Sequence, residues 1–169
     1  DRPTQGSVEI GGVSLGDKSE SQLASFRNSH VGFVFQFHYL MEDFTALENV
    51  MIPMLVAGKS HADAGRRAEQ LLATVGLKER TTHRPTQLSG GEQQRVAVAR
   101  ALANDPEIVL ADEPSGDLDT ATGRMLHDLL FRLNREQNIA FLIATHNREL
   151  ADGCHRTLAI VEGKLCEKP

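Results

Sequence analysis

The chain has 169 residues, enough to form one domain around a single hydrophobic core. Apolar residues make up 40% and charged residues 24%, a balance typical of globular domains, and no apolar stretch approaches the roughly 20 residues of a membrane-spanning helix. The formal net charge of −5 leaves no surplus of basic side chains to neutralise phosphates, so we expect no nucleic-acid partner.

The first third of the chain predicts two strands and the start of a helical region. The chain opens on Asp1 and not on methionine, so we expect it to be part of a longer protein. A short strand is predicted over residues 4–12, and a buried one over the apolar run at 31–35, which ends at Gln36. The pattern of residues 40–105 is mostly helical, and we expect a helical subdomain there.

Two amphipathic helices are predicted from cap and periodicity signals. Ser60 starts the first, with Asp63 at the third position and Gly76 at the stop. Its apolar face consists of Ala64, Ala68, Leu71, Leu72 and Val75. The second helix is expected over residues 118–135, with Leu126, Leu129, Leu130 and Leu133 on one face.

Further strands are predicted at 108–111, at 139–145 and, with a turn at Glu162 and Gly163, at 158–165. Continuous apolar runs are typical of parallel strands that are buried on both faces. Ligands of open α/β sheets bind beyond the carboxyl ends of such strands. We therefore expect the residues that follow the three buried strands, Gln36, Asp112, Glu113 and His146, to line one edge. A polar residue that merely ends a strand is the alternative for any single one of them.

Residues 88–95, with the sequence LSGGEQQR, form the most specific segment of the chain. Ser89 and Glu92 match the capping box that starts a helix, and apolar residues follow. A cap does not explain the adjacent Gly90 and Gly91. Glycines at a helix entry let a ligand approach the backbone, where free N–H groups attract a phosphate. The segment predicts a helix start that also binds phosphate.

Residues 88–92 resemble the signature motif of ABC ATPases. The resemblance implies an α/β fold, a P-loop NTPase-like (RecA-like) mixed sheet core with a helical subdomain, incomplete at the N-terminus. Residues 1–169 would be a partial nucleotide-binding domain and about 40–105 its helical signature subdomain. In this family the motif contacts ATP bound to the opposite subunit of a head-to-tail homodimer. Ser89, Gly90, Gly91 and Glu92 are thereby implied to bind ATP.

Two adjacent carboxylates, Asp112 and Glu113, end the predicted strand at 108–111. Phosphoryl transfer needs one carboxylate near Mg²⁺ and another to orient or deprotonate water. Together with the following residues 115–119, this segment resembles the Walker B strand and D-loop of the family. The resemblance implies that Asp112 supports the metal, that Glu113 is the catalytic base and that Asp119 belongs to the cofactor-binding set. The family commonly has asparagine where Asp117 stands.

His146 and Gln36 gain meaning from their order among these motifs. Alone, a histidine is more often structural and a glutamine carries little information. In this order His146 resembles the family's switch histidine, which touches the γ-phosphate. Gln36 resembles the Q-loop glutamine, which contacts metal and nucleotide and relays the change to the membrane subunits. The resemblance therefore assigns catalytic roles to both and a metal role to Gln36.

The phosphate-binding motif G-x-x-x-x-G-K-[ST] does not occur in these 169 residues. We expect this chain alone to bind ATP poorly and to hydrolyse essentially none. We expect the full-length parent to be the active Mg²⁺-dependent ATPase.

Residues 36–40, 43–50, 83–85 and 110–114 are similar to the ATPases of lipoprotein-releasing transporters. The resemblance implies a peripheral position on the cytoplasmic face of the bacterial inner membrane. Residues 37–55 would receive the integral membrane subunits. Related ATPases of macrolide or peptide exporters and of the cell-division complex are alternatives. A soluble ABC ATPase of translation or DNA repair usually carries two cassettes or a long insertion. A non-catalytic regulatory module would have no reason to keep Glu113.

Overall fold

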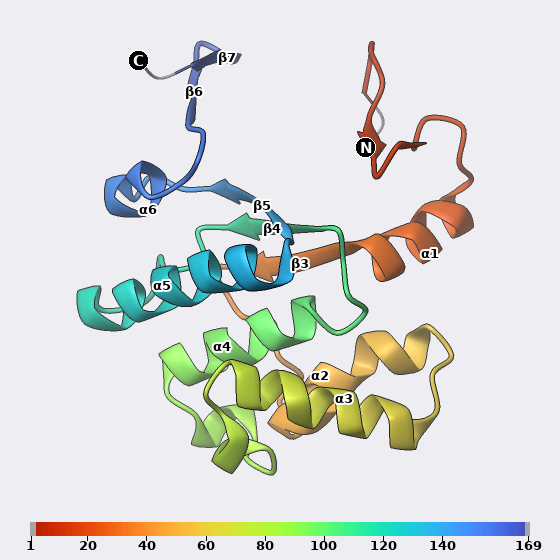
Figure 1. Ribbon diagram of the computed structural model, residues 1–169, viewed down its shortest axis with the longest axis vertical. Helices are drawn as coiled ribbons and strands as arrows, with labels where there is room; N and C mark the ends of the chain where they lie inside the picture. The colour runs from red at the N-terminus through yellow and green to blue at the C-terminus, as the bar shows by residue number, and fades with distance from the viewer. Residues whose placement is uncertain (1–2, 168–169) are drawn as a thin grey trace.

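The computed structural model describes residues 3–167, and its centre is a three-stranded parallel sheet (Figure 1). The strands are β3 (Val31–Phe35), β4 (Ile108–Asp112) and β5 (Ala140–Ala144), in that order. In register, Phe35 pairs with Asp112 and Asp112 with Ala144, so the three carboxyl ends lie at one edge. The three strands expected from the apolar runs are confirmed to within one residue at each end.

One face of the sheet packs against two helices, α4 (Gly90–Ala101) and α5 (Thr120–Gln137). Helix α5 begins two residues later than expected, because Asp119 caps it by accepting hydrogen bonds from the backbone N–H groups of Ala121 and Thr122. The predicted apolar face of α5 is buried. It joins Val34, Val109 and Ala111 of the sheet in one core.

A helical layer lies below the sheet, formed by α2 (Ala46–Val56), α3 (His61–Thr74), α4 and 3₁₀ turns at Lys78–Arg80 and Pro85–Gln87 (Figure 1). The α3 prediction is confirmed, since the Ser60 side chain accepts from the Asp63 N–H and Gly76 has φ +76°. Helix α1 (Glu20–His30) leads straight into β3, and α6 (Arg148–Asp152) follows β5. Within residues 3–167, none of the helices has the length and apolar character needed to span a membrane.

Two antiparallel hairpins project from the other side of the sheet (Figure 1): β1 (Glu9–Ile10) with β2 (Val13–Ser14), and β6 (Leu158–Val161) with β7 (Lys164–Glu167). The single strand expected over residues 4–12 is wrong. Gly11 and Gly12 both have positive φ, which reverses the chain in a two-residue turn. The turn at Glu162 and Gly163 is confirmed, and both residues again have positive φ.

The second face of the sheet is largely open within the described residues. Leu142, in register with Leu110 and Phe33, is 61% exposed, whereas Val109 on the opposite face is 1% exposed. The expectation that the strands are buried on both faces is therefore wrong for β5. Its apolar residues satisfy that pattern, but the helices of residues 3–167 cover only one side.

Candidate active site at the carboxyl edge of the sheet

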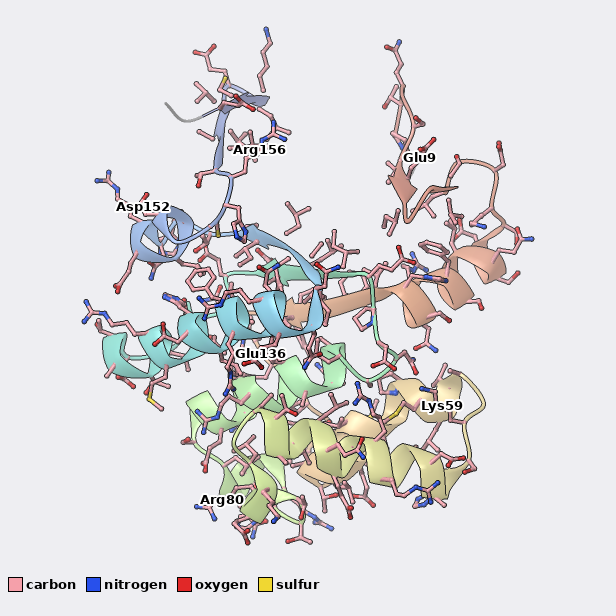
Figure 2. The ribbon with its side chains drawn as sticks, viewed as in Figure 1. Glu9, Lys59, Arg80, Glu136, Asp152 and Arg156 are labelled. Carbon is pink, nitrogen blue, oxygen red and sulfur yellow. The ribbon has the colours of Figure 1, made fainter. Side chains whose placement is uncertain are left out.

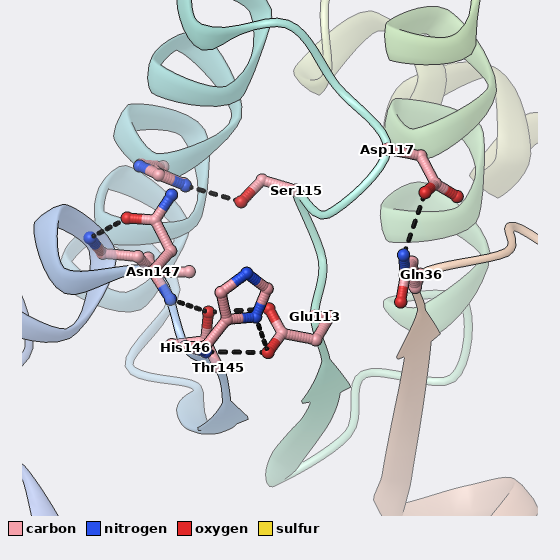
Figure 3. Close-up of polar contacts among 9 residues, drawn as sticks. Gln36, Glu113, Ser115, Asp117, Thr145, His146 and Asn147 are labelled. Atoms are coloured by element: carbon pink, nitrogen blue, oxygen red, sulfur yellow. Dashed lines mark hydrogen bonds and ion pairs between the residues drawn. The ribbon is translucent and has the colours of Figure 1, made fainter.

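Glu113 and His146 meet at the carboxyl edge (Figure 3). One carboxylate oxygen of Glu113 accepts a hydrogen bond from the backbone N–H of His146 at 2.7 Å and lies 2.6 Å from its ring Nδ1. The other accepts from the Thr145 hydroxyl at 2.9 Å. Because a carboxylate only accepts, the imidazole carries a proton on Nδ1. The ends of β4 and β5 thus hold Glu113 and His146 in direct contact.

The surroundings of Glu113 keep it ionised. Partial burial raises the pKa of Glu113, but hydrogen bonds from His146 and Thr145 outweigh burial and bring the pKa below its usual value. Its backbone is also fixed, because Glu113 has φ +42° and its N–H donates to the Ala144 carbonyl at 2.9 Å. The His146 side chain is 86% exposed, so its ring has solvent on most sides.

Asp112 lies beside Glu113 and is exposed. Across residues 3–167, no other side chain forms a hydrogen bond or ion pair with its carboxylate. The same residues contain no group of three or more His, Cys, Asp or Glu side chains that could hold a metal alone. Mg²⁺ is usually bound by one or two carboxylates together with substrate phosphates, so an unpaired Asp112 fits this ion.

Gln36 follows β3, and within residues 3–167 its side chain forms no hydrogen bond with Asp112. Its side-chain N–H donates to the Asp117 carboxylate at 2.9 Å (Figure 3). A Cβ at Gly116 would lie 2.9 Å from the same Gln36 nitrogen, so the two loops are pressed together. The structure therefore brings Gln36 to the 115–119 segment.

The predicted capping box at the start of α4 is confirmed. Ser89 accepts from the Glu92 N–H at 3.3 Å, and Glu92 accepts from the Ser89 N–H at 2.9 Å. The second oxygen of Glu92 lies 3.0 Å from Nε of Arg80, which is labelled at the foot of the helical layer in Figure 2. Both carboxylate oxygens of Glu92 are thus used within the chain, which leaves Ser89 and Gly90 as the exposed residues of the segment.

Gly91 has a packing role that the sequence did not reveal. A Cβ there would lie 2.3 Å from the Thr122 side chain, so its absence lets the starts of α4 and α5 approach closely. Asp119 is likewise committed to a cap, and hydrogen bonds from Thr122 lower the pKa of Asp119. These contacts give Gly91 and Asp119 structural roles at the starts of α4 and α5.

Sequence reasoning missed His127 near the edge, and it gave Ser115 and Gln94 no role of their own within the segments 115–119 and 88–95. The buried ring of His127 lies 2.9 Å from the Ser115 hydroxyl, and the buried Gln94 amide contacts two backbone carbonyls. His127 adjoins the apolar face of the helix expected over 118–135, and a polar residue beside such a face is the signal that was available.

A cleft of about 170 Å³ lies between Glu113, His146 and the start of α5.

We expect Glu92→Gln to destabilise the protein at neutral pH and to change its acid response. Hydrogen bonds from Ser89 and the Arg80 guanidinium lower the pKa of Glu92 to about 2. Because this folded-state pKa is below the unfolded value, its stabilisation is present above about pH 4.5 and is lost as pH falls towards 2. Glutamine keeps a cap acceptor but loses the ion pair, at a cost of about 1 kcal/mol.

Urea unfolding at pH 7 and pH 3 measures this difference. The gap between wild type and Glu92→Gln should narrow at the lower pH, whereas Glu69→Gln on the exposed side of α3 should show no such gap. An equal gap at both pH values would contradict the assignment.

Comparison with known proteins agrees with this geometry. A family model described as "ABC transporter" matches residues 1–116. The lipoprotein-releasing system ATP-binding protein LolD of Geobacter metallireducens is 52% identical over 165 residues, which cover 98% of this chain and 73% of that protein. LolD of Porphyromonas gingivalis is also 52% identical, over 98% of this chain and 75% of that protein.

Solved structures give the same result. The dimeric ATP-binding cassette MJ0796, bound to ADP and phosphate in a post-hydrolysis state, superposes with a TM-score of 0.85 at 38% identity. The match covers 98% of this chain and 73% of that one. The expected P-loop NTPase-like fold is thereby confirmed.

Proposed function

Because this chain belongs to the ABC transporter family of ATP-binding subunits, we propose that it powers the release of lipoproteins from the bacterial inner membrane. The observation that carries the catalytic part is the contact of Glu113 with His146 at the carboxyl edge. Identities of about 50% to LolD proteins, over nearly the whole chain, support the lipoprotein-releasing system over related exporters.

We assign Glu113 as the general base. Its ionised carboxylate accepts the proton of the water that attacks the terminal phosphate of ATP. His146 holds that carboxylate through two contacts, and its exposed ring is able to turn from Glu113 towards the phosphate. The protein thus works mainly by positioning groups and stabilising charge.

Asp112 and Gln36 are the residues that would hold Mg²⁺, and Mg²⁺, when bound, neutralises charge on the phosphate oxygens. Asp112 has no competing partner among residues 3–167. Gln36 donates through its side-chain N–H₂ group to the Asp117 carboxylate at 2.9 Å, and its amide oxygen is the atom that would bind the metal.

We assign Ser89, Gly90 and Gly91 to the nucleotide of a second copy in a head-to-tail homodimer. The N-terminus of α4 points free N–H groups and positive potential outward, which suits a phosphate. Glu92 and Asp119 support this nucleotide site indirectly, because they cap α4 and α5 and so hold the starts of these helices in place. The dimeric state of MJ0796 supports the arrangement.

Residues 37–55 are proposed to contact the integral membrane subunits from the cytoplasmic face. Phe37, Tyr39 and Phe44 expose 61%, 67% and 41% of their surface, and a group of exposed apolar side chains is typical of an interaction site. In contrast Val50 is fully buried and belongs to the core. We propose that residues 40–105 form the helical signature subdomain of a nucleotide-binding domain that includes residues 1–169.

Turnover is proposed to require a phosphate-binding loop that these 169 residues do not contain. A Mg-ATP titration followed by phosphate release compares the chain alone with a fusion that carries the phosphate-loop segment of the Geobacter relative. Only the fusion should bind ATP tightly and turn it over. Robust hydrolysis by the unfused chain would contradict the assignment of the site.

The lipoprotein part has its own test. The fusion is reconstituted with the integral subunits of a lipoprotein-releasing transporter in proteoliposomes, and release of a labelled lipoprotein is measured. ATP-dependent release is expected. If the fusion turns over ATP without releasing the lipoprotein, but drives macrolide transport with the membrane subunits of an exporter, the chain would be assigned to that related system.

A further inference from the structure

Gln94 is a fully buried polar residue that touches the backbone beside two site residues. It lies on α4, five residues after Ser89, and has 0% exposure. Its side-chain N–H₂ donates to the Phe35 carbonyl at 3.2 Å and to the Pro114 carbonyl at 2.6 Å. Phe35 directly precedes Gln36, and Pro114 directly follows Glu113. One amide thus links the ends of β3 and β4.

Arg100, near the end of the same helix, holds the chain on the far side of Gln36. Its two terminal nitrogens donate to the carbonyls of His38 and Tyr39, each at 2.7 Å. Tyr39 has φ +46°, a conformation that costs free energy for a residue with a side chain. The guanidinium offsets this cost by fixing the peptide on either side of it.

The side-chain oxygen of Gln94 has no hydrogen-bond partner among the described residues. An unpaired buried acceptor is unfavourable, so stability alone would favour an apolar residue of similar volume. The two hydrogen bonds of the side-chain nitrogen, both to backbone next to site residues, compensate for this unpaired oxygen. Gln94 therefore contributes more to the position of the backbone around the site than to core packing.

We propose that Gln94 and Arg100 are positioning residues that make α4 a rigid link from the 88–95 segment to Gln36 and Glu113. A shift of α4, whose N-terminus carries Ser89 and Gly90, then moves the backbone on both sides of Gln36. The link itself is inferred from the contacts alone. Its role in ATP turnover rests on the proposed function.

The test measures backbone order by ¹⁵N relaxation on the 169-residue chain without nucleotide. Gln94→Met keeps the side-chain volume and removes both hydrogen bonds. We expect the order parameters of residues 36, 115 and 116 to fall from about 0.85 to below about 0.6. The matched control is Gln93→Met, because the Gln93 amide donates only to the carbonyls of Pro85 and Leu88. It should loosen residues 85–88 and leave the other three unchanged.

Arg100→Lys provides the second variant and decides the test if Gln94→Met does not fold. The ammonium keeps the charge but lacks the two-pronged donor geometry. Order should fall at residues 38–39 and stay high at 115–116. Unchanged order parameters in both variants, or the same loss in Gln93→Met, would overturn the proposal. Because no nucleotide is used, the order parameters test the link even if the proposed function is wrong. Likewise, a failed link would not contradict the proposed function.

Discussion

Glu113→Gln is expected to lower ATP turnover by a factor of about 10² to 10⁴ and to leave ATP binding in place, when measured in the fusion that carries a phosphate-binding loop. Glutamine has the same shape but cannot accept a proton. Its carbonyl oxygen can still receive the two His146 contacts, and the Thr145 hydroxyl can rotate to accept from the new amide. The ATP-bound dimer should therefore accumulate. Phosphate release and nucleotide binding measure the two effects separately.

Glu107→Gln is the matched control for this substitution. Glu107 immediately precedes β4 at its opposite end and pairs with the ring Nδ1 of His30 at 2.9 Å, so the chemical change is nearly the same. Its turnover should stay within about twofold of wild type, since both partners are exposed and such pairs contribute little. Normal turnover in Glu113→Gln would remove Glu113 from the base role.

Two glycine-to-alanine substitutions are expected to change stability in opposite directions. Gly32 is buried in β3, and an alanine Cβ would lie 2.5 Å from the backbone carbonyl of Ala101 and 3.0 Å from Val109. Backbone cannot yield as a flexible side chain does, so Gly32→Ala should cost about 3 kcal/mol or more. Gly65 lies within α3 with no atom within 4 Å of an added Cβ. Gly65→Ala should stabilise the protein by about 0.5–1 kcal/mol.

Denaturant unfolding of both variants at pH 7 checks the pair. A Gly32→Ala protein as stable as wild type would mean that the end of α4 moves easily away from β3. That result would also weaken the rigid link proposed for α4. Destabilisation by Gly65→Ala would indicate that α3 has tertiary contacts at this position.

Features that depend on neighbouring residues were predictable from the sequence. The capping box of Ser89 and Glu92 uses atoms three residues apart, and the three strands follow from unbroken apolar runs. The start of α5 was misplaced because Asp119 is a cap in its own right. The hairpin at Gly11 and Gly12 had a usable signal, since paired glycines favour a two-residue turn.

Hydrogen bonds between residues far apart in the chain were not predictable. Gln94 reaches Phe35 across 59 positions, and only the packing of α4 under the sheet brings them together. The Glu113–His146 contact spans 33 positions. We expected the two residues to lie close together, because both follow strands whose carboxyl ends meet at one edge. The hydrogen bonds between them were not expected. Exposure of Leu142 escaped prediction because an apolar run has the same pattern on a covered and an uncovered face.

The outer edge of β5 also affects how the purified chain behaves at high concentration. Within residues 3–167, β5 pairs only with β4, which leaves one row of its peptide groups beside the exposed Leu142. An unprotected edge of this kind is a template for intermolecular strand addition and aggregation. The net charge of −5 opposes such association through mutual repulsion, and that repulsion vanishes near the isoelectric point of about 5.8. Solubility should therefore be lowest in mildly acidic buffer, and alkaline conditions will keep the chain dispersed.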